Sequence, residues 1–435
     1  DENVKLKVLF AELDPDPILQ VNSEGIIINM NEPALELFTS KYLNQRYENL
    51  IPIFKHSKDD EVIDCTGRFV TKSFAIGHHH VYSALSRGMP SPTQKINNFV
   101  EKLKYIWWRL DKALDKETIE ASALATAIAC AKSGVTFAID HHASPNFIKG
   151  SLGIISDAFK KVGVGHLLCY EVTDRDGLDK ANEGLDESED YLANNQGLVG
   201  LHASFTVGDF TLKKAVDLMQ KMNSGIHIHV AEDGWDQNQC MTQYNKNVVE
   251  RLSDAGVLSS SKTILAHCLH INDSERQLIG SSPAFVVQNT ESNLNNNVGY
   301  FNSKGLGDNI MIGTDGMHSD MIRSSQAAFF VGQGRDNIDF LSSYYRFRKV
   351  HNYLSDNNFD GDDENNLVIL DYDSPTELND DNFFGHFIYG LTSKHVQHVI
   401  ANGKIIVKDR VVQTVDESEI LSFAKEQANK LWKYL

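Results

Sequence analysis

The chain has 435 residues, which is enough for one large domain with a smaller one beside it. Hydrophobic residues make up 41% and charged residues 23%, a globular composition that excludes an intrinsically disordered protein. The 59 acidic residues outnumber the 41 Lys and Arg residues, and the net charge of -18 argues against nucleic acid or an anionic membrane as a partner, because both would repel it.

Two further features indicate the cellular compartment. No apolar run approaches the ~20 residues that a membrane-spanning helix needs, and the opening DENVKLKVLF has neither the basic nor the apolar part of a signal peptide. The five cysteines are scattered and form no Cys-x-x-Cys pair, which favours a reducing cytosol over a disulfide framework. We therefore expect a cytoplasmic protein.

Residues 1–66 contain three strand-like pieces, VKLKVLF, PILQVN and GIIINM. We assign this segment to a small β-rich domain. Residues 9–38 also resemble the opening of a PAS sensor domain, although the match covers only about half of such a domain. No sensing function is assigned to it.

Between residues 67 and 354, short apolar runs alternate with longer amphipathic segments. Near-continuous apolar strands that alternate with helices indicate a parallel sheet covered by helices. Eight such units over ~250 residues match a (β/α)8 barrel of the TIM type. The alternative is a doubly wound open sheet, but no Gly-rich phosphate loop follows the first strand. The expected strands are 73–77, 135–140, 165–171, 198–204, 225–230, 263–267, 284–288 and 309–314.

The last part of the chain, residues 355–435, has a different pattern. Short strands are expected within 366–378 and 395–415, with a hairpin turn at the sequence NGK. A final helix is expected over 417–435. The simplest arrangement pairs strands from the two ends of the chain in one small β domain outside the barrel.

Histidines and acids occupy the ends of several expected strands, where barrel enzymes carry their chemistry. The first strand ends in GHHHV, and its His78 and His80 point the same way on an extended chain, so they can converge on one ion. Imidazole and carboxylate groups are ligands of zinc and similar divalent ions. The other groups expected at this rim are His229 and Glu232 after the fifth strand, His267 after the sixth and Asp315 after the eighth.

Taken singly, each of these motifs also occurs among ordinary surface or core residues, but their joint order at separate strand ends favours a site. The motifs HHHVYSALSRG, HIHVAE, ILAHCLH, NTESNLNNNVGY and GTDG resemble the amidohydrolase superfamily, in its deaminase and chlorohydrolase branch. The stretches WWRLDKAL, GVTFAIDHHASPN, CYEVTDRDG and GTDGMHSDM resemble SsnA-type aminohydrolases within that branch. The resemblance covers residues 62–435.

The resemblance implies one divalent metal ion per chain, with zinc expected and iron or manganese as alternatives. Glu232 and His267 would not be ligands but would handle protons and position the water. His227 competes with His229 for the ligand role, and the His-x-x-Glu spacing favours His229. The fourth strand has no lysine that could be carboxylated to bridge a second ion, so a mononuclear site is expected. The implied ligands are His78, His80, His229 and Asp315.

These residue types support hydrolytic deamination. A divalent ion lowers the pKa of bound water from about 15.7 towards ~7 and so provides a metal-bound hydroxide at neutral pH. Asp315 would accept the proton of the water, Glu232 would protonate a ring nitrogen of the substrate, and His267 would hold the hydroxide. The expected substrate is a small nitrogen heterocycle such as a purine or a pyrimidine.

Five residues are candidates for contact with the substrate. His202 ends the fourth strand, where related deaminases carry a matching histidine, and a hydrogen-bonded structural role is the alternative. His142 follows the second strand beside His141, and an ordinary loop position is the alternative for either residue. The candidates are His202, His142, Trp108, Arg109 and Gln288.

The last three of these candidates rest on weaker patterns. Trp107, Trp108 and Arg109 would form a lid over a flat ring, but an aromatic pair in an amphipathic helix is more often part of the core. Gln288 stands where related enzymes usually carry histidine. That departure alters the expected substrate side of the site and leaves the expected metal ligands unchanged.

Two alternatives to a deaminase stay open. The same hydroxide can displace chloride or open a cyclic amide, so a chlorohydrolase or a cyclic-amide hydrolase is one of them. The other is a catalytically silent regulatory or binding protein, which would be expected to lose a proton-handling residue. Glu232, His267 and Asp315 are all present, and this favours the enzyme. Family resemblance also leaves a homo-oligomer open.

Overall fold

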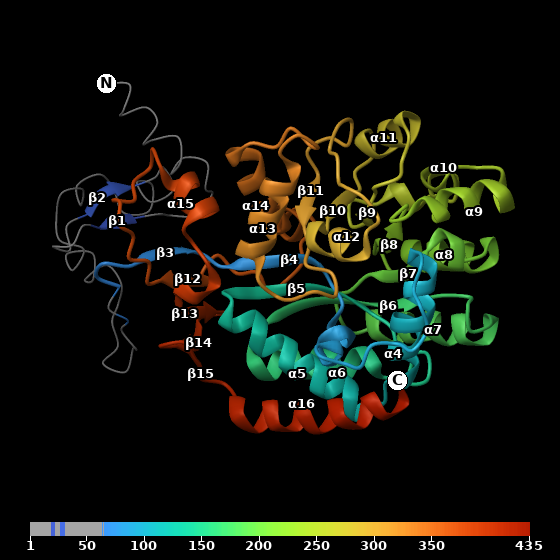
Figure 1. Cartoon of the computed structure of the whole chain (residues 1–435), viewed down its shortest axis with the longest axis horizontal. Helices are drawn as coiled ribbons and strands as arrows, with labels where there is room; N and C mark the ends of the chain where they lie inside the picture. Colours follow the sequence, from blue (N-terminus) through green and yellow to red (C-terminus); the bar gives the residue numbers. More distant parts are fainter. Residues whose placement is uncertain (1–18, 22–26, 31–62, 64) are drawn as a thin grey trace.

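Figure 1 shows the computed structural model of the chain, which describes residues 19–21, 27–30, 63 and 65–435. Strands β1 (Leu19–Val21) and β2 (Ile27–Met30) form a separate antiparallel pair. The expected strand VKLKVLF and most of the PAS-like stretch lie outside the described residues.

The centre of the molecule is a barrel of eight parallel strands, which confirms the predicted (β/α)8 fold. Neighbouring strands pair in chain order. The ring closes between the last strand and the first, where the backbone N–H groups of Thr314 and Asp315 both donate to the carbonyl of His78 at 3.0 Å. The strands are β4 (Phe74–His79), β5 (Val135–His142), β6 (Gly165–Val172), β7 (Val199–Ala203), β8 (Ile226–Val230), β9 (Ile264–His267), β10 (Phe285–Gln288) and β11 (Ile310–Ile312).

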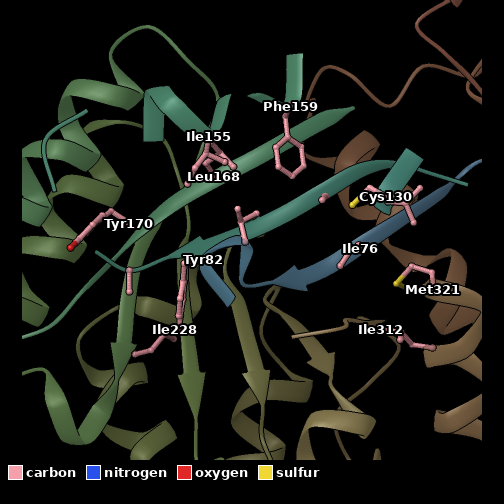
Figure 2. Close-up of a cluster of buried hydrophobic side chains, with 14 of the residues drawn as sticks. Ile76, Tyr82, Cys130, Ile155, Phe159, Leu168, Tyr170, Ile228, Ile312 and Met321 are labelled. Atoms are coloured by element: carbon pink, nitrogen blue, oxygen red, sulfur yellow. The ribbon is translucent and has the colours of Figure 1, made fainter. Parts of the chain in front are cut away.

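Helices cover the outside of the barrel (Figure 1). Their buried faces are apolar: in α6, Ile155 and Phe159 lie beside Leu168 of β6, as Figure 2 shows. Burying each such side chain stabilises the fold by about 1.5–3 kcal/mol. The helices around the barrel are α5 (Lys116–Lys132), α6 (Ser151–Val162), α7 (Leu178–Leu192), α8 (Asp209–Lys221), α9 (Gly234–Tyr244), α10 (Val248–Asp254), α11 (Asp273–Gly280), α12 (Thr290–Asn296), α13 (Met321–Gly332) and α14 (Phe340–Asp356).

The barrel interior is filled with side chains below its carboxyl rim. Phe137 of β5, Leu167 of β6 and Val287 of β10 belong to one fully buried cluster. Tyr353 of α14 joins this cluster from the amino end, and its hydroxyl donates to the carbonyl of Lys262 at 2.8 Å. The polar groups of the rim therefore stand on a rigid, packed base.

A second, antiparallel sheet combines strands from both sides of the barrel sequence, which confirms the predicted small β domain in outline. Its outer strand β3 lies within the segment that the sequence analysis assigned to the barrel, and it pairs with β12. The expected hairpin forms at Asn402 and Gly403, whose φ angles of 50° and 71° suit a tight two-residue turn. In sheet order the strands are β15 (Val411–Val412), β14 (Lys404–Lys408), β13 (Val396–Ala401), β12 (Leu367–Leu370) and β3 (Phe69–Lys72).

The final helix α16 (Glu417–Leu431) leaves this sheet and runs along α5 of the barrel (Figure 1). Lys132 pairs with Glu417 at 2.7 Å near the start of the contact. Beyond the helix, the indole N–H of Trp432 donates to the carbonyl of Leu85 at 2.8 Å. The C-terminal segment is thus attached to the barrel, close to the loop that follows β4.

Two of the sequence predictions concern membrane-spanning helices and the state of the cysteines. In the described part of the chain, no helix is both long enough and apolar enough to cross a bilayer. Four of the five cysteines, Cys130, Cys169, Cys240 and Cys268, are buried free thiols.

The carboxylate of Asp362 joins the small sheet to the barrel. It accepts from Nδ1 of His351 in α14 at 2.7 Å and pairs with Nζ of Lys72 in β3 at 3.1 Å. Burial alone would raise the pKa of Asp362, but His351 and Lys72 outweigh it and lower the pKa from 3.8 to about 2. The ionised form is therefore stabilised by folding.

We expect Asp362→Asn to lower the free energy of unfolding by about 2 kcal/mol at pH 7. A carboxyl whose folded pKa is depressed contributes stability above its unfolded pKa, so the difference from wild type should shrink as pH falls from 4 towards 2. Denaturant unfolding at several pH values measures it. Glu364→Gln, an exposed carboxylate in the same loop, is the control, and equal stability of Asp362→Asn and wild type at pH 7 would contradict the expectation.

Candidate metal centre and active site

The carboxyl ends of four barrel strands, β4, β8, β9 and β11, bring the predicted histidines and acids together. Nε2 of His80 lies 3.1 Å from Nε2 of His229 and 3.2 Å from Oδ1 of Asp315. Nε2 of His78 lies 4.0 Å from the same carboxylate oxygen. These four side chains surround one point, as the sequence predicts for the metal ligands.

Backbone carbonyls fix the direction of two of these imidazoles. Nδ1–H of His80 donates to the carbonyl of His141 at 2.6 Å, and Nδ1–H of His229 donates to the carbonyl of His202 at 2.8 Å. In both rings the lone pair of Nε2 is therefore free and directed to the common point. Carbonyl partners of this kind are typical of histidines that bind a metal.

His78 completes the nitrogen set from deeper in the barrel. Its Nδ1 lies 2.8 Å from Nε2 of His227, which places His227 behind His78 and away from Asp315. Nε2 of His78 is buried and has no hydrogen-bond partner among the described residues. This geometry favours His229 over His227 as the candidate ligand.

Burial also sets the charge state that a metal requires. The pKa values of His78, His80 and His229 are all lowered because the protonated rings would be desolvated. The three imidazoles are thus neutral near pH 7, the form that donates a lone pair to a metal. Three nitrogen donors and one carboxylate fit a divalent ion such as zinc.

Glu232, just after β8, and His267, at the end of β9, face Asp315. Nε2 of His267 lies 3.5 Å from Oδ2 of Asp315 and 3.6 Å from Oε2 of Glu232. Helix α12 holds both groups: Oδ1 of Asn293 accepts from Nδ1–H of His267 at 2.8 Å, and the amide of Asn296 donates to Glu232 at 3.2 Å. The two asparagines are three positions apart and so share one face of the helix.

Two of these functional residues adopt a backbone conformation that L-residues rarely use. The φ angle is 74° at His267 and 52° at Asp315, in the left-handed region. Such strain costs about 1–3 kcal/mol per residue and is concentrated at functional sites. At Asp315 the strained turn follows the barrel-closing hydrogen bonds directly.

Burial also affects the charge of the neighbouring Glu232. It raises the pKa of the Glu232 carboxyl to about 7, so a large fraction of this carboxyl is protonated at neutral pH.

A cavity opens over this group of side chains. Two of the predicted substrate contacts, His202 and Trp108, line it. Their ring centroids are 6.2 Å apart, and Nδ1 of His202 lies 2.6 Å from the Thr206 hydroxyl. The cavity therefore combines aromatic surfaces with the polar floor. Its aromatic and acidic walls include Trp107, Trp108, Phe99, Phe205, Asp111, Glu171 and Asp236.

Three predicted substrate contacts do not line this cavity. His142 is fully buried, and its Nε2 lies 2.9 Å from the Ser144 hydroxyl. Arg109 donates to the carbonyl of Leu435 at the end of the chain. Gln288 follows the inward-facing Val287 and points outward, where Arg346 of α14 donates to its side-chain oxygen at 2.8 Å. Strand alternation explains the outward direction of Gln288.

Three charged residues at the cavity, Glu171, Asp111 and Arg175, were not among the site residues predicted from the sequence. Glu171 lies near the end of β6 and lines the cavity, and Asp111 forms an ion pair with Arg175 beside it. The rule that places chemistry at strand ends applies to Glu171 in CYEVTDRDG and could have found it. Asp111 gives no comparable signal, because it comes from the connection between β4 and β5.

A parallel barrel whose carboxyl rim gathers buried histidines, a glutamate and an aspartate has the architecture of a metal-dependent hydrolase. Residues 77–359 match the model of the amidohydrolase family, and the chain belongs to that family. The resemblance noted in the sequence is thereby confirmed.

Relatives and solved structures extend the likeness over most of the chain. The 5-methylthioadenosine/S-adenosylhomocysteine deaminase of Syntrophomonas wolfei is 24% identical over 402 residues, 86% of this chain and 89% of the relative. The 5'-deoxyadenosine deaminase of Methanopyrus kandleri is 27% identical over 376 residues, 81% and 84% of the two chains. The structure of an adenosine deaminase from Xanthomonas campestris with bound zinc has a TM-score of 0.71 at 16% identity, covering 96% of this chain and 94% of that one, and shows the same fold.

We expect His80→Ala and Asp315→Ala each to lower the bound divalent metal by about one equivalent relative to wild type, because each removes one of four ligands. Elemental analysis of the purified proteins measures it. His142→Ala removes a buried histidine at the same rim that does not face the cluster, and it should keep the wild-type metal content. Unchanged metal in both His80→Ala and Asp315→Ala would show that these residues hold no ion.

Proposed function

We propose that this protein is a metal-dependent aminohydrolase that removes the amino group from a small nitrogen heterocycle, with aminopurine nucleosides as the first substrates to test. The observation that carries the proposal is the meeting of Glu232, His267 and Asp315 beside the imidazoles of His78, His80 and His229. Four of these side chains, His80, His229, Glu232 and Asp315, line one cavity. The names of the adenine-nucleoside deaminases among the relatives support the substrate class.

The histidine cluster and Asp315 would hold the ion, which supplies an acidified water as nucleophile when it is bound. Oδ2 of Asp315 faces His267, so the carboxylate can take the proton of that water while the imidazole orients it. The Nδ1–H of His267 is engaged by Asn293, and this holds its Nε2 toward Asp315 and Glu232.

Glu232 would act on the substrate ring. Its side chain is partly exposed at the edge of the cavity, and its raised pKa of about 7 keeps a proton available near neutral pH. A protonated Glu232 can donate to a ring nitrogen, which makes the adjacent carbon more electrophilic. Glu232 can then take the proton of the newly added hydroxyl group and pass it to the amino group, which leaves as ammonia, and the proton held by Asp315 restores Glu232. The side-chain amide of Asn296 donates to Oε1 of Glu232 at 3.2 Å, while Oε2 faces His267. This contact fixes the orientation of the Glu232 carboxyl.

The upper cavity has the chemistry for a flat ring. The rings of Trp108 and Phe205 both lie near His202, at centroid distances of 6.2 and 5.6 Å from it. Aromatic faces stabilise stacked heterocycles, and His202 can exchange a hydrogen bond with a ring atom. His202 and Trp108 therefore remain candidate substrate contacts.

The ion and the compartment complete the proposal. Zinc is the ion that best fits three neutral imidazoles and one carboxylate, with iron and manganese as the alternatives to be separated by elemental analysis. Four buried cysteines that are free thiols, Cys130, Cys169, Cys240 and Cys268, support the cytoplasm as the compartment.

Glu232→Gln provides the sharpest test of this mechanism. We expect it to keep the metal content and the melting temperature of wild type but to lose about 10²–10⁴-fold in kcat/KM, because the amide cannot donate and accept a proton in turn. Ammonia release from adenosine, 5'-deoxyadenosine, 5'-methylthioadenosine, guanine and cytosine measures the activity. Glu187→Gln, which changes a buried glutamate in α7 away from the cavity, is the matched control.

Two results would contradict the proposal. One is a metal-loaded wild-type protein that releases no ammonia from any compound in the panel. The other is a Glu232→Gln variant with wild-type activity, which would place the proton transfer elsewhere.

A further inference from the structure

The cavity over the candidate metal centre has an acidic wall. Among the described residues, carboxylates line it and neither Lys nor Arg does. Glu232 and Asp315 already have roles in the proposed reaction, and the other acids do not. The acidic residues that line the cavity are Asp111, Glu171, Glu232, Asp233, Asp236 and Asp315.

Two of the unused carboxylates hold the backbone in place. Asp233 caps the start of α9, where it accepts from the backbone N–H of Trp235 at 2.8 Å. Asp236 accepts from the backbone N–H groups of Phe205 at 3.1 Å and Ala231 at 3.0 Å. The carboxylates that are left to act on a ligand are those of Asp111 and Glu171.

Asp111 and Glu171 each have one oxygen atom without a hydrogen bond. Asp111 is 1% exposed and Glu171 is 3% exposed, and both line the cavity. Oδ1 of Asp111 and Oε2 of Glu171 are buried and accept no hydrogen bond from the described residues. Nδ1 of His141 approaches Oε2 of Glu171 to 3.3 Å without the geometry of a hydrogen bond. Native proteins rarely leave buried carboxylate oxygens without a donor, so these two atoms indicate a donor that belongs to a ligand.

The charges around this wall do not balance. Arg175 pairs with Asp111 and, at 3.0 Å, with Asp176. Lys112 also pairs with Asp176, at 2.5 Å. Glu171 lies close enough to Arg175 and Asp111 for both charges to act on its pKa. In this part of the described chain, three carboxylates therefore share two cations.

The imidazoles beside Glu171 do not supply the missing charge. Burial lowers the pKa values of His141 and His202, so both rings are neutral near pH 7. Burial also raises the pKa of Asp111 to about 6 and that of Glu171 well above its usual value. A cationic group beside the two carboxyls would favour their ionised forms.

We propose that Asp111 and Glu171 bind a planar, cationic or amino group of the substrate, of the amidine or guanidine type. Such a group presents several N–H donors in one plane, which suits carboxylate oxygens, and its flat face suits the neighbouring Trp108. The inference rests on the proposed function and narrows its substrate class to rings that carry a second amino group besides the one removed. 2,6-Diaminopurine has such a group, and adenine does not.

The first test measures binding and does not depend on turnover. Benzamidine and benzamide are flat ligands of nearly the same size, but benzamidine is a cation at neutral pH and benzamide is neutral. Isothermal titration calorimetry on the metal-loaded full chain gives the affinity for each. We expect benzamidine to bind at least about tenfold more tightly, because its hydrogen bonds to carboxylates are charge-assisted, and added salt to reduce the difference.

Two variants assign this preference to the acidic wall. Glu171→Gln and Asp111→Asn should each reduce the preference for benzamidine at least about fivefold, because each replaces a carboxylate by a neutral amide. Glu187→Gln, which changes a buried glutamate outside the cavity, should keep the wild-type preference. If Asp111→Asn does not fold because Arg175 loses a partner, Glu171→Gln provides the assignment.

The second test measures ammonia release. Wild type should have a kcat/KM for 2,6-diaminopurine at least about tenfold above that for adenine, and Glu171→Gln should reduce this ratio. Equal affinities for benzamidine and benzamide, no binding of benzamidine, or an unchanged preference in the folded variants would overturn the inference. Ammonia release without a preference for benzamidine would leave the proposed function standing, whereas the preference without ammonia release from any compound would overturn the proposed function and leave a cation-binding cavity.

Discussion

The site depends on the way the barrel closes. The carbonyl of His78 accepts two hydrogen bonds at 3.0 Å from the chain just beyond β11, and this register sets Asp315 beside the first strand. Ligands that are more than 230 positions apart in the sequence become neighbours through these two bonds. A shift of the last strand would move Asp315 away from His80. The four candidate metal ligands would then no longer surround one point.

Closure also explains where the backbone strain lies. Asp315 and His267 leave their strands through left-handed turns, and each turn re-aims a side chain that strand alternation would send elsewhere. The packed interior beneath them, with Phe137, Leu167 and Tyr353, resists relaxation of these turns. The free energy of core packing thus maintains a strained but well-ordered rim.

Electrostatics at the rim follow from burial more than from net charge. The clustered histidines are neutral because desolvation disfavours their protonated forms, and the same desolvation raises the pKa of Glu232 and Glu171. Neutral imidazoles are suited to hold a cation, and a carboxyl with a raised pKa is suited to exchange protons. The strongly acidic composition of the whole chain has little bearing on this local arrangement.

Much of the molecule could be predicted from the sequence, because its signals are local. Apolar runs with intervening amphipathic segments determine eight strands and their helices, and the two-residue period of a strand places His78 and His80 on one side. The order of motifs at strand ends was enough to nominate His229, Glu232, His267 and Asp315, and the structure brings all of them together.

Contacts between distant segments could be decided only by the tertiary structure. The sequence could not show that His141 faces the cluster while His142 turns to Ser144, or that Arg109 is held by the C-terminal Leu435. Nor could the sequence show that Arg175 pairs with Asp111 and Asp176, which come from different parts of the chain. Pattern along the chain determines which residues reach the rim, but the pairing of side chains across strands determines what each of them does there.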